Sequence, residues 1–361
     1  MRVLVWQWGR RGAGPRFAAC LAAALRGMVE VTLSLSRDAE IMRGADAPVC
    51  GMPVATYRGA WSLLWRILTL PAGLVWRLRA VRPDLAICAM PGPLDLLMVA
   101  ALRVVGARVV VVVHDAERHL GDGFPLQMML QRLLCRCADR VAVLTAHVGD
   151  RLVAQGLAGR FGGKLVGFRH PPFVFAMPDR VPGRRRLLCF GRLLPYKGLD
   201  LLASALASGG LDVEVRVVGL GPETASLAAL RACPGVTVEN GWVPEEAIGA
   251  LLAWSDAVIL PYREASQSGV VAAAIAAGRP VIATRVGGLA EQLVGAPAIL
   301  CEPEAGALRE AIRGWLAGAV PMMGPVDATE AWRIAVARLV AECGGIGGEE
   351  PGAMAGAEVV V

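Results

Sequence analysis

Residues 254–292 read WSDAVILPYREASQSGVVAAAIAAGRPVIATRVGGLAEQ, and this stretch decides the fold. The apolar run over residues 257–260 predicts a buried strand. The alanine-rich segment over residues 270–277 predicts a helix that ends at Gly278, and residues 281–284 begin the next strand. A strand, a helix and a strand in this order form a βαβ unit, so the sequence predicts a parallel sheet.

The beginning of that predicted helix offers a place for an anion. Ser268, Gly269 and Val270 stand in its first turn, where backbone N–H groups lack partners inside the helix and carry a partial positive charge. Such a helix start binds phosphate groups, and a glycine lets the phosphate approach the main chain closely. A glycine here also suits tight packing of a helix on a sheet, so this stretch alone supports either interpretation.

A second stretch, residues 187–200, reads LLCFGRLLPYKGLD and favours the phosphate site. Its apolar strand ends in Gly191 and Arg192, and Lys197 and Gly198 follow just before the next predicted helix. In a parallel sheet, ligands bind at the carboxyl ends of the strands. Two cations and two glycines at such an end are the groups expected to hold a diphosphate without a metal ion.

The two stretches together resemble one protein family. A Gly-Arg pair, a Lys-Gly pair after four further residues, and later Pro-Tyr-Arg-Glu-Ala-Ser-Gln-Ser-Gly and Ala-Gly-Arg-Pro-Val-Ile-Ala-Thr are similar to the nucleotide-binding lobe of group 1 glycosyltransferases (family 4-like). These are retaining, nucleotide-sugar-dependent enzymes of the GT-B fold. The resemblance is specific over residues 185–295 and weaker over residues 1–175. It implies an α/β fold with two Rossmann-like, doubly wound parallel-sheet lobes that face an interlobe cleft.

The resemblance also implies which residues meet the sugar donor. Arg192 and Lys197 would stabilise the charge on the leaving diphosphate, His114 would orient the sugar, and Glu264 would lie near it. Backbone positions complete the site: Gly12 and Gly14 in the first glycine loop, Gly191, the base-binding Gly241, Trp242 and Val243, and the helix start at Ser268, Gly269 and Val270.

One position departs from the family pattern. Most relatives carry a pair of glutamates, the first near the sugar and the second on the ribose hydroxyls. Glu264 lies close to the first position, whereas residues 272–274 are alanines and offer no ribose contact. Two interpretations follow: a subfamily that binds ribose in another way, or a catalytically silent lobe kept as a partner subunit in polysaccharide assembly. The presence of Arg192, Lys197 and Gly269 favours the active enzyme.

The residues themselves also favour a ligand site at His114. The strand predicted over residues 107–113 is unusually rich in valine, which is typical of a parallel strand covered on both faces, and it ends in His114 and Asp115. A lone histidine is more often structural, but polar groups at the carboxyl end of such a strand lie where ligands bind. His119 is placed in the loop that follows.

Residues 9–15 form a glycine loop between the first predicted strand and the first predicted helix. The order is that of a Rossmann unit, but the G-x-x-G-x-G spacing differs from the dinucleotide-binding one, and no acid directly ends the second strand. We therefore expect no nucleotide cofactor in this half. We expect no metal site either, because the sequence lacks an Asp-x-Asp pair.

Composition limits the class of protein. Of 361 residues 55% are hydrophobic, and 37 basic against 31 acidic side chains give a net charge of +6, which suits an anionic ligand or lipid head groups. No apolar run reaches the ~18 residues of a membrane span, and the N-terminus fits a strand better than a signal peptide. Nine scattered cysteines indicate buried thiols in a reducing compartment. We expect a cytoplasmic protein that binds no nucleic acid.

Residues 58–82 combine three tryptophans with five arginines. Such a mixture is typical of a helix at a membrane interface, with arginines toward head groups and indoles at the acyl boundary. The alternative is a buried helix broken at Pro71 with a solvated basic edge. The resemblance favours peripheral contact with the inner face of the plasma membrane, because many relatives act on lipid-linked acceptors.

The chain is predicted to contain two domains. Residues 1–172 form the acceptor-side lobe, residues 173–186 a linker and residues 187–328 the nucleotide-sugar-binding lobe. A helix over residues 329–343 is expected to cross back to the first lobe, and the Gly/Ala/Glu-rich tail over residues 344–361 to be disordered.

The resemblance, supported by these residues, implies a metal-independent glycosyltransferase that moves a hexose from a UDP- or GDP-sugar to a saccharide or lipid-linked saccharide with retention. The first alternative is a non-catalytic GT-B scaffold that binds a membrane or a partner transferase. A sugar-nucleotide epimerase of the same fold is less favoured, because the first half shows no cluster of buried acids. Sugar, acceptor and linkage depend on variable loops and are not predicted.

Overall fold

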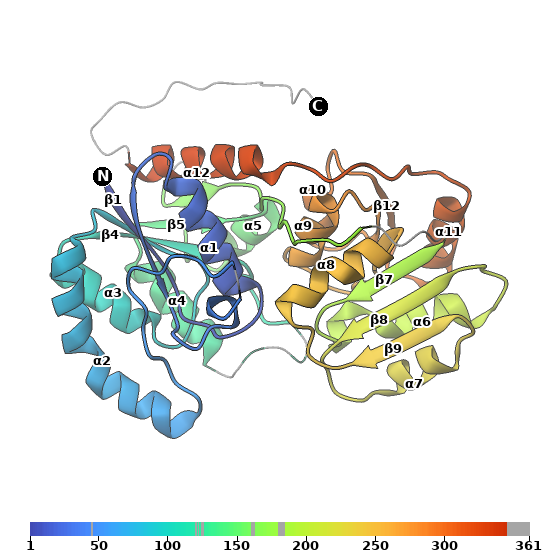
Figure 1. The fold of residues 1–361 in the computed structure, drawn as a ribbon, viewed down its shortest axis with the longest axis horizontal. Coiled ribbons are helices and arrows are strands. Elements are labelled where there is room, and N and C mark those ends of the chain that lie inside the picture. The colour runs from blue at the N-terminus through green and yellow to red at the C-terminus, as the bar shows by residue number, and fades with distance from the viewer. Residues whose placement is uncertain are drawn as a thin grey trace.

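The protein consists of two lobes, each built on a parallel sheet with helices on both faces (Figure 1). The computed structural model describes residues 1–44, 46–119, 121, 123, 126–159, 163–179 and 185–344. The predicted α/β fold with two doubly wound lobes is confirmed.

The first lobe contains a six-stranded sheet in the order β2-β1-β3-β4-β5-β6. Its strands are β1 (Arg2–Gln7), β2 (Glu30–Leu35), β3 (Leu85–Cys88), β4 (Arg108–Val113), β5 (Arg140–Val143) and β6 (Leu165–Gly167). The direction of strand addition reverses between β1 and β3, and a doubly wound sheet binds its ligands at the carboxyl end of such a point.

Alternation of side chains along the strands of the first lobe produces two cores. Leu4 and Trp6 of β1 belong to one core, and Val3 and Val5 belong to the other. The helices over the first face are α2 (Ala60–Val81), α3 (Asp95–Val104), α4 (Gln127–Cys137) and α5 (Ala146–Ala154), and α1 (Ala13–Leu25) and α12 (Ala328–Gly344) cover the second. The short helix η1 (Glu40–Met42) follows β2.

The second lobe has its six strands in the order β12-β11-β10-β7-β8-β9. The strands are β7 (Arg186–Phe190), β8 (Glu214–Gly219), β9 (Val236–Asn240), β10 (Ala257–Leu260), β11 (Val281–Thr284) and β12 (Ala298–Cys301). Its helices are η2 (Pro195–Lys197), α6 (Leu199–Ala207), α7 (Ala225–Ala232), α8 (Glu245–Trp254), α9 (Gly269–Ala276), α10 (Leu289–Gln292) and α11 (Ala305–Leu316). The order is that of dinucleotide-binding Rossmann folds, and its reversal point lies between β7 and β10. The two sequence stretches that predicted the phosphate site therefore meet at that point.

The helix α12 returns from the second lobe and lies along the first (Figure 1). Trp332 Nε1 donates a hydrogen bond to the carbonyl of Pro172 at 2.9 Å, and Val336 and Leu339 are fully buried against the first sheet. Arg108 Nη1 donates to the carbonyl of Cys343 at 2.9 Å. Beyond Gly344, the predicted disordered tail lies outside the described residues.

The helix α2 corrects one interpretation of residues 58–82. Pro71 lies inside a continuous helix rather than at a break, and only Leu74 and Leu78 of that helix are fully buried. The alternative of a buried, broken helix is therefore wrong. No helix in the described part of the chain is both long enough and apolar enough to span a bilayer.

Candidate functional site

The predicted cations Arg192 and Lys197 follow β7, and the helix α9 follows β10. The carboxyl ends of these two neighbouring strands bring the cations and the start of the helix close together. A Cβ atom added at Gly191 would lie 3.6 Å from Val270 Cγ2, so the end of β7 touches the first turn of α9. Lys197 Nζ lies 3.7 Å from the centre of the Tyr262 ring, and the Tyr262 hydroxyl lies 3.4 Å from Ser268 Oγ. The cation and the helix start thus share one aromatic neighbour.

Two tyrosines that sequence analysis did not single out hold the predicted cations. Arg192 Nη2 donates a hydrogen bond to the Tyr196 hydroxyl at 3.2 Å, and Lys197 Nζ lies 4.9 Å from the centre of the same ring. A cation over an aromatic ring is attracted by the electron-rich face. Burial raises the pKa of Tyr262 well above its usual range, so that phenol stays neutral. Tyr196 and Tyr262 therefore fix the two cations without neutralising them.

The start of α9 presents fewer free amides than the sequence suggested. Ser268 Oγ accepts a hydrogen bond from the Val270 N–H at 3.2 Å as the helix cap, and Gln292 Oε1 accepts from the Ser268 N–H at 2.9 Å. Among the residues that the structure describes, the Gly269 N–H of these three is the one with no hydrogen-bond partner. Of the three backbone N–H groups predicted to bind a phosphate, the Gly269 N–H is therefore the one left for a ligand. The Ser268 and Val270 N–H groups already donate to Gln292 and to Ser268 Oγ.

A second helix start, from the first lobe, lies close to the start of α9. A Cβ atom added at Gly269 would lie 3.8 Å from Ala13 Cβ, so the N-termini of α9 and α1 approach each other. Gly12 caps α1 at φ 83°, and a Cβ added there would meet nothing within 4 Å, whereas one at Gly14 would come within 2.8 Å of Gln7 Nε2. A glycine is therefore needed at position 14 so that the helix can pack against Gln7, whereas the space beside Gly12 is unoccupied by other described residues. Two positive helix ends pointing at one place favour an anion there.

His114 lies at the end of β4, buried between the lobes. Its Nε2 lies 2.8 Å from the Ala89 carbonyl, which only accepts, so Nε2 carries the proton and Nδ1 accepts from Gln267 Nε2 at 3.4 Å. Burial lowers the pKa of His114 below its usual range. The ring is therefore neutral, and both of its nitrogens contact protein. The buried Gln267 Oε1 has no hydrogen-bond partner among the described residues, which makes Gln267 the free polar group at this point.

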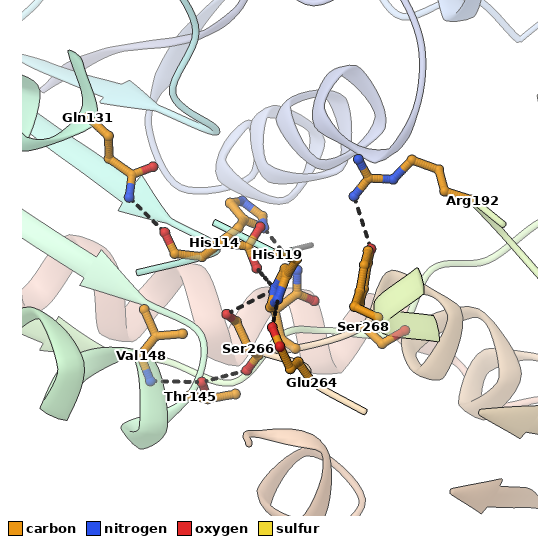
Figure 2. A network of polar contacts seen from close by, with 12 residues as sticks. His114, His119, Gln131, Thr145, Val148, Arg192, Glu264, Ser266 and Ser268 are labelled. Carbon is orange, nitrogen blue, oxygen red and sulfur yellow. Dashed lines mark hydrogen bonds and ion pairs between the residues drawn. The ribbon is translucent and has the colours of Figure 1, made fainter. Parts of the chain in front are cut away.

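A cluster that sequence analysis missed lies beside His114, and we call it the histidine bridge: Asp115, His119, Glu264 and Ser266 (Figure 2). His119 Nε2 lies 3.1 Å from Asp115 Oδ1 of the first lobe, and its Nδ1 lies 3.4 Å from Glu264 Oε2 of the second. Ser266 Oγ is 3.4 Å from His119 Nε2. The predicted sugar-site acid Glu264 is thus tied to the first lobe.

The turn after β9 reaches the first lobe through a side chain. Trp242 Nε1 donates to Glu40 Oε1 at 3.2 Å, and the guanidinium carbon of Arg11 lies 5.2 Å from the indole centre. Gly241 N–H donates to the Gly219 carbonyl at 2.9 Å, and Val243 packs against the core of its own lobe. The main chain at this turn is therefore fixed from both sides.

Other polar contacts join the lobes around the site. Arg16 Nε of α1 donates to Glu245 Oε1 of α8 at 2.5 Å. The Ala146 N–H at the start of α5 donates to Glu291 of α10, at 2.7 Å to one carboxylate oxygen and 2.8 Å to the other. These pairs are far apart in the chain, so no local pattern reveals them.

The alanines at the position of the expected second glutamate are core residues. Ala272, Ala273 and Ala274 are all buried, and the Ala272 carbonyl accepts a hydrogen bond from the Phe173 N–H at 3.1 Å. The helix α9 carries no acidic residue. Within the described ranges, no three His, Cys, Asp or Glu residues are grouped so that they could hold a metal ion.

Two family models match the chain, one in each lobe. A "Glycosyl transferase 4-like domain" matches residues 12–160, and "Glycosyl transferases group 1" matches residues 184–318. The chain is also similar to a curated protein, the 2-deoxystreptamine glucosyltransferase of Streptomyces kanamyceticus. The two are 27% identical over 261 residues, which make up 64% of this chain and 67% of that protein.

Solved structures share the two-lobed fold at low sequence identity. Anabaena Alr3699/HepE, solved with UDP and glucose, matches with a TM-score of 0.67 and 17% identity over 95% of each chain. Sucrose-phosphate synthase from Thermosynechococcus elongatus matches with a TM-score of 0.65 and 15% identity over 95% of this chain and 94% of that one. The UDP-GlcNAc 2-epimerase of Neisseria meningitidis matches with a TM-score of 0.60 and 13% identity over 94% of this chain and all of that one. At these identities the likeness describes the fold.

Proposed function

We propose that this chain, a glycosyltransferase of the GT-B fold, transfers a hexose from a UDP-sugar to a saccharide or lipid-linked saccharide acceptor, with retention and without a metal ion. UDP is chosen over GDP because UDP and glucose occupy the similar Anabaena protein. A hexose is chosen as the transferred sugar because the curated relative is a glucosyltransferase. We further propose that such a transfer belongs to polysaccharide assembly.

The observation that carries the proposal is the convergence of Arg192, Lys197 and the starts of α9 and α1 at one end of the second sheet. Cleavage of the anomeric bond builds negative charge on the β-phosphate of the leaving nucleoside diphosphate. A guanidinium, an ammonium and the Gly269 N–H, all fixed before the reaction, would stabilise that charge more than they stabilise the ground state. The acceptor would attack the face from which the diphosphate departs.

The sugar would lie between the two lobes near His114 and Glu264. His114 is neutral and its nitrogens are occupied, so we assign it the task of orienting Gln267, whose free carbonyl oxygen would accept from a sugar hydroxyl. The base would lie on the main chain of residues 241–243. No acidic side chain of α9 would reach the ribose, so backbone or water would complete that contact.

The proposal is tested by Arg192→Ala and Lys197→Ala. Each should lower kcat/KM for transfer by roughly a hundredfold or more, because a charged donor to the transition state is lost. Arg285→Ala removes an arginine that is paired with Glu302 at the surface and should leave transfer unchanged.

Calorimetry with UDP, GDP and ADP identifies the nucleotide and distinguishes the enzyme from a scaffold. We expect heat of binding with UDP, and a weaker signal for Lys197→Ala. Full activity in both site variants would remove the proposed site, and the absence of binding by all three nucleotides would indicate a non-catalytic scaffold.

We also propose that α2 brings the enzyme to the inner face of the plasma membrane. Trp61, Trp65, Leu68 and Trp76 are 86, 64, 77 and 74% exposed, and their spacing places them on one side of the helix. The helix contains no acidic residue, so nothing on it repels anionic lipid. A surface of this composition fits a lipid-linked acceptor.

A further inference from the structure

His119 lies between carboxylates that belong to different lobes. Its side chain is 11% exposed, with Nε2 at 3.1 Å from Asp115 Oδ1 and Nδ1 at 3.4 Å from Glu264 Oε2. An ionised carboxylate oxygen can only accept a hydrogen bond, so each contact requires a proton on the facing nitrogen. Both contacts are hydrogen bonds only when the ring is a doubly protonated imidazolium.

The other groups around His119 support that state. The ring stacks on Tyr196 at 4.7 Å between centres and 18° between planes, which holds it in the plane that reaches both acids. Ser266 Oγ adapts to either donor or acceptor. Three cations belong to the same surroundings: Arg118 precedes His119 in the chain, and Arg192 and Lys197 contact Tyr196, at its hydroxyl and over its ring.

The charges that face the ring favour its protonation. Burial lowers the pKa of His119, but the hydrogen bonds and charges of Asp115 and Glu264 together raise it above the usual range for histidine. His114, which lies beside Asp115, is neutral and adds no opposing charge. The two carboxylates, which contact the ring directly, therefore favour the imidazolium.

We propose that His119 is a positioning residue that, as an imidazolium, clasps Asp115 to Glu264 across the two lobes and so holds Glu264 at the donor sugar. Glu264 is 48% exposed at its side chain and has no other hydrogen-bond partner among the described residues, so without the clasp it would rotate freely. This inference rests on the proposed function, because it gives Glu264 a sugar to meet.

Loss of one proton would open the clasp on the Glu264 side. A neutral ring keeps a single N–H, which stays on the shorter contact to Asp115 and leaves the Nδ1 lone pair facing the Glu264 carboxylate. The two would then repel each other. Transfer should therefore fall as the pH rises through the titration of His119, and kcat should fall more than KM rises, because the ground-state contacts to the diphosphate are unaffected.

The first test is a side-chain NMR titration of the full chain, whose four histidines are distinguished by substitution. We expect His119 to titrate above the ~6.5 of an unperturbed histidine, and Glu264→Gln to lower its midpoint, because that change keeps the shape and removes the charge. This readout needs no sugar donor. A midpoint at or below ~6.5, or one that Glu264→Gln leaves in place, would overturn the proposal.

The second test is the pH profile of transfer. His119→Gln should lower kcat about tenfold, the factor that matches the loss of one charged hydrogen bond, and should abolish the alkaline limb of the profile. His147→Gln is the matched control, because that histidine also lies at the lobe interface, close to Gly287, but outside the histidine bridge; it should keep the wild-type profile.

The two tests separate this inference from the proposed function. If His119→Gln retains the alkaline limb, the clasp is wrong even though transfer stands. If Arg192→Ala and Lys197→Ala retain full transfer, the proposed site is wrong, whatever the NMR titration shows. If His119→Gln fails to fold, Glu264→Gln replaces it in the second test, because the Glu264 side chain is exposed. That variant should likewise lose the alkaline limb of the pH profile.

Discussion

His170 shows how a single buried side chain couples stability to pH. It lies in the aromatic cluster of Phe17 and Phe173, where burial, with a smaller effect of His114, lowers its pKa to about 3. A histidine with a depressed pKa stays neutral in the folded state, while the unfolded chain takes up a proton below ~6.5. Its contribution to stability is therefore present at neutral pH and is lost as the pH falls.

The expected size of this effect is about 2 kcal/mol between pH 7 and pH 5, from the two pKa values. Urea unfolding at both pH values should show a loss for the wild-type chain that is larger by about this amount than the loss for His170→Gln. Equal losses for the two proteins would mean that His170 is not the group responsible.

At the residue level, the sequence predicted which chain segments lie close together when they follow neighbouring strands of one sheet. The end of β7 at Gly191 lies beside the start of α9 at Val270 because β7 and β10 are adjacent at the reversal point. The sequence did not reveal that Ser268 Oγ caps the helix or that the Ser268 N–H donates to Gln292, because these contacts depend on the folded positions of the side chains. His119 was assigned only to a loop, since its partner Glu264 is distant in the chain and on the other lobe.

At the level of elements, α2 differs from the other helices of its lobe. Helices α3, α4 and α5 bury an apolar face on the sheet, whereas α2 has apolar residues on both its buried and its exposed sides. A helix that is apolar all round is normally covered. The continuity of α2 through Pro71 was not predicted, because proline usually ends or kinks a helix.

The proposed membrane role of α2 is tested by sedimentation with vesicles of phosphatidylcholine and phosphatidylglycerol. Replacing Trp61 and Trp65 by serine should weaken binding at least roughly tenfold, because two indoles no longer enter the interface. Ile334→Ser removes an exposed apolar residue from α12 and should have no effect. The proposed role of α2 is refuted if the wild-type protein does not bind anionic vesicles. It is also refuted if the tryptophan variant binds them as strongly as the Ile334→Ser control.

At the scale of the whole molecule, both lobes were predictable because each repeats alternating strands and helices, and this order permits few parallel sheets. The way in which the lobes meet was not predictable. It depends on pairs such as Arg16 with Glu245 and Trp242 with Glu40, which join residues more than two hundred positions apart. Sequence periodicity describes neighbours along a helix or strand and carries no information on such pairs.

The return of α12 to the first lobe should contribute strongly to stability. Trp332 is buried and packs on Phe17 and Phe173, so Trp332→Ala should lower the free energy of unfolding by about 3 kcal/mol or more. Arg333→Ala breaks only an exposed pair with Glu330 and should cost less than about 1 kcal/mol. Urea unfolding of the two variants measures the difference, and similar values would show that α12 is only loosely held.

The crossing of α12 also has a consequence for biosynthesis. A ribosome releases β1–β6 first, then the whole of the second lobe, and only afterwards the helix that covers Phe17 and Leu21 of α1. The newly made first lobe therefore keeps an uncovered apolar surface while the second lobe is translated and folds. Chaperones that recognise exposed apolar segments would meet this protein during that interval, and a transcript cut before α12 would leave the surface permanently bare.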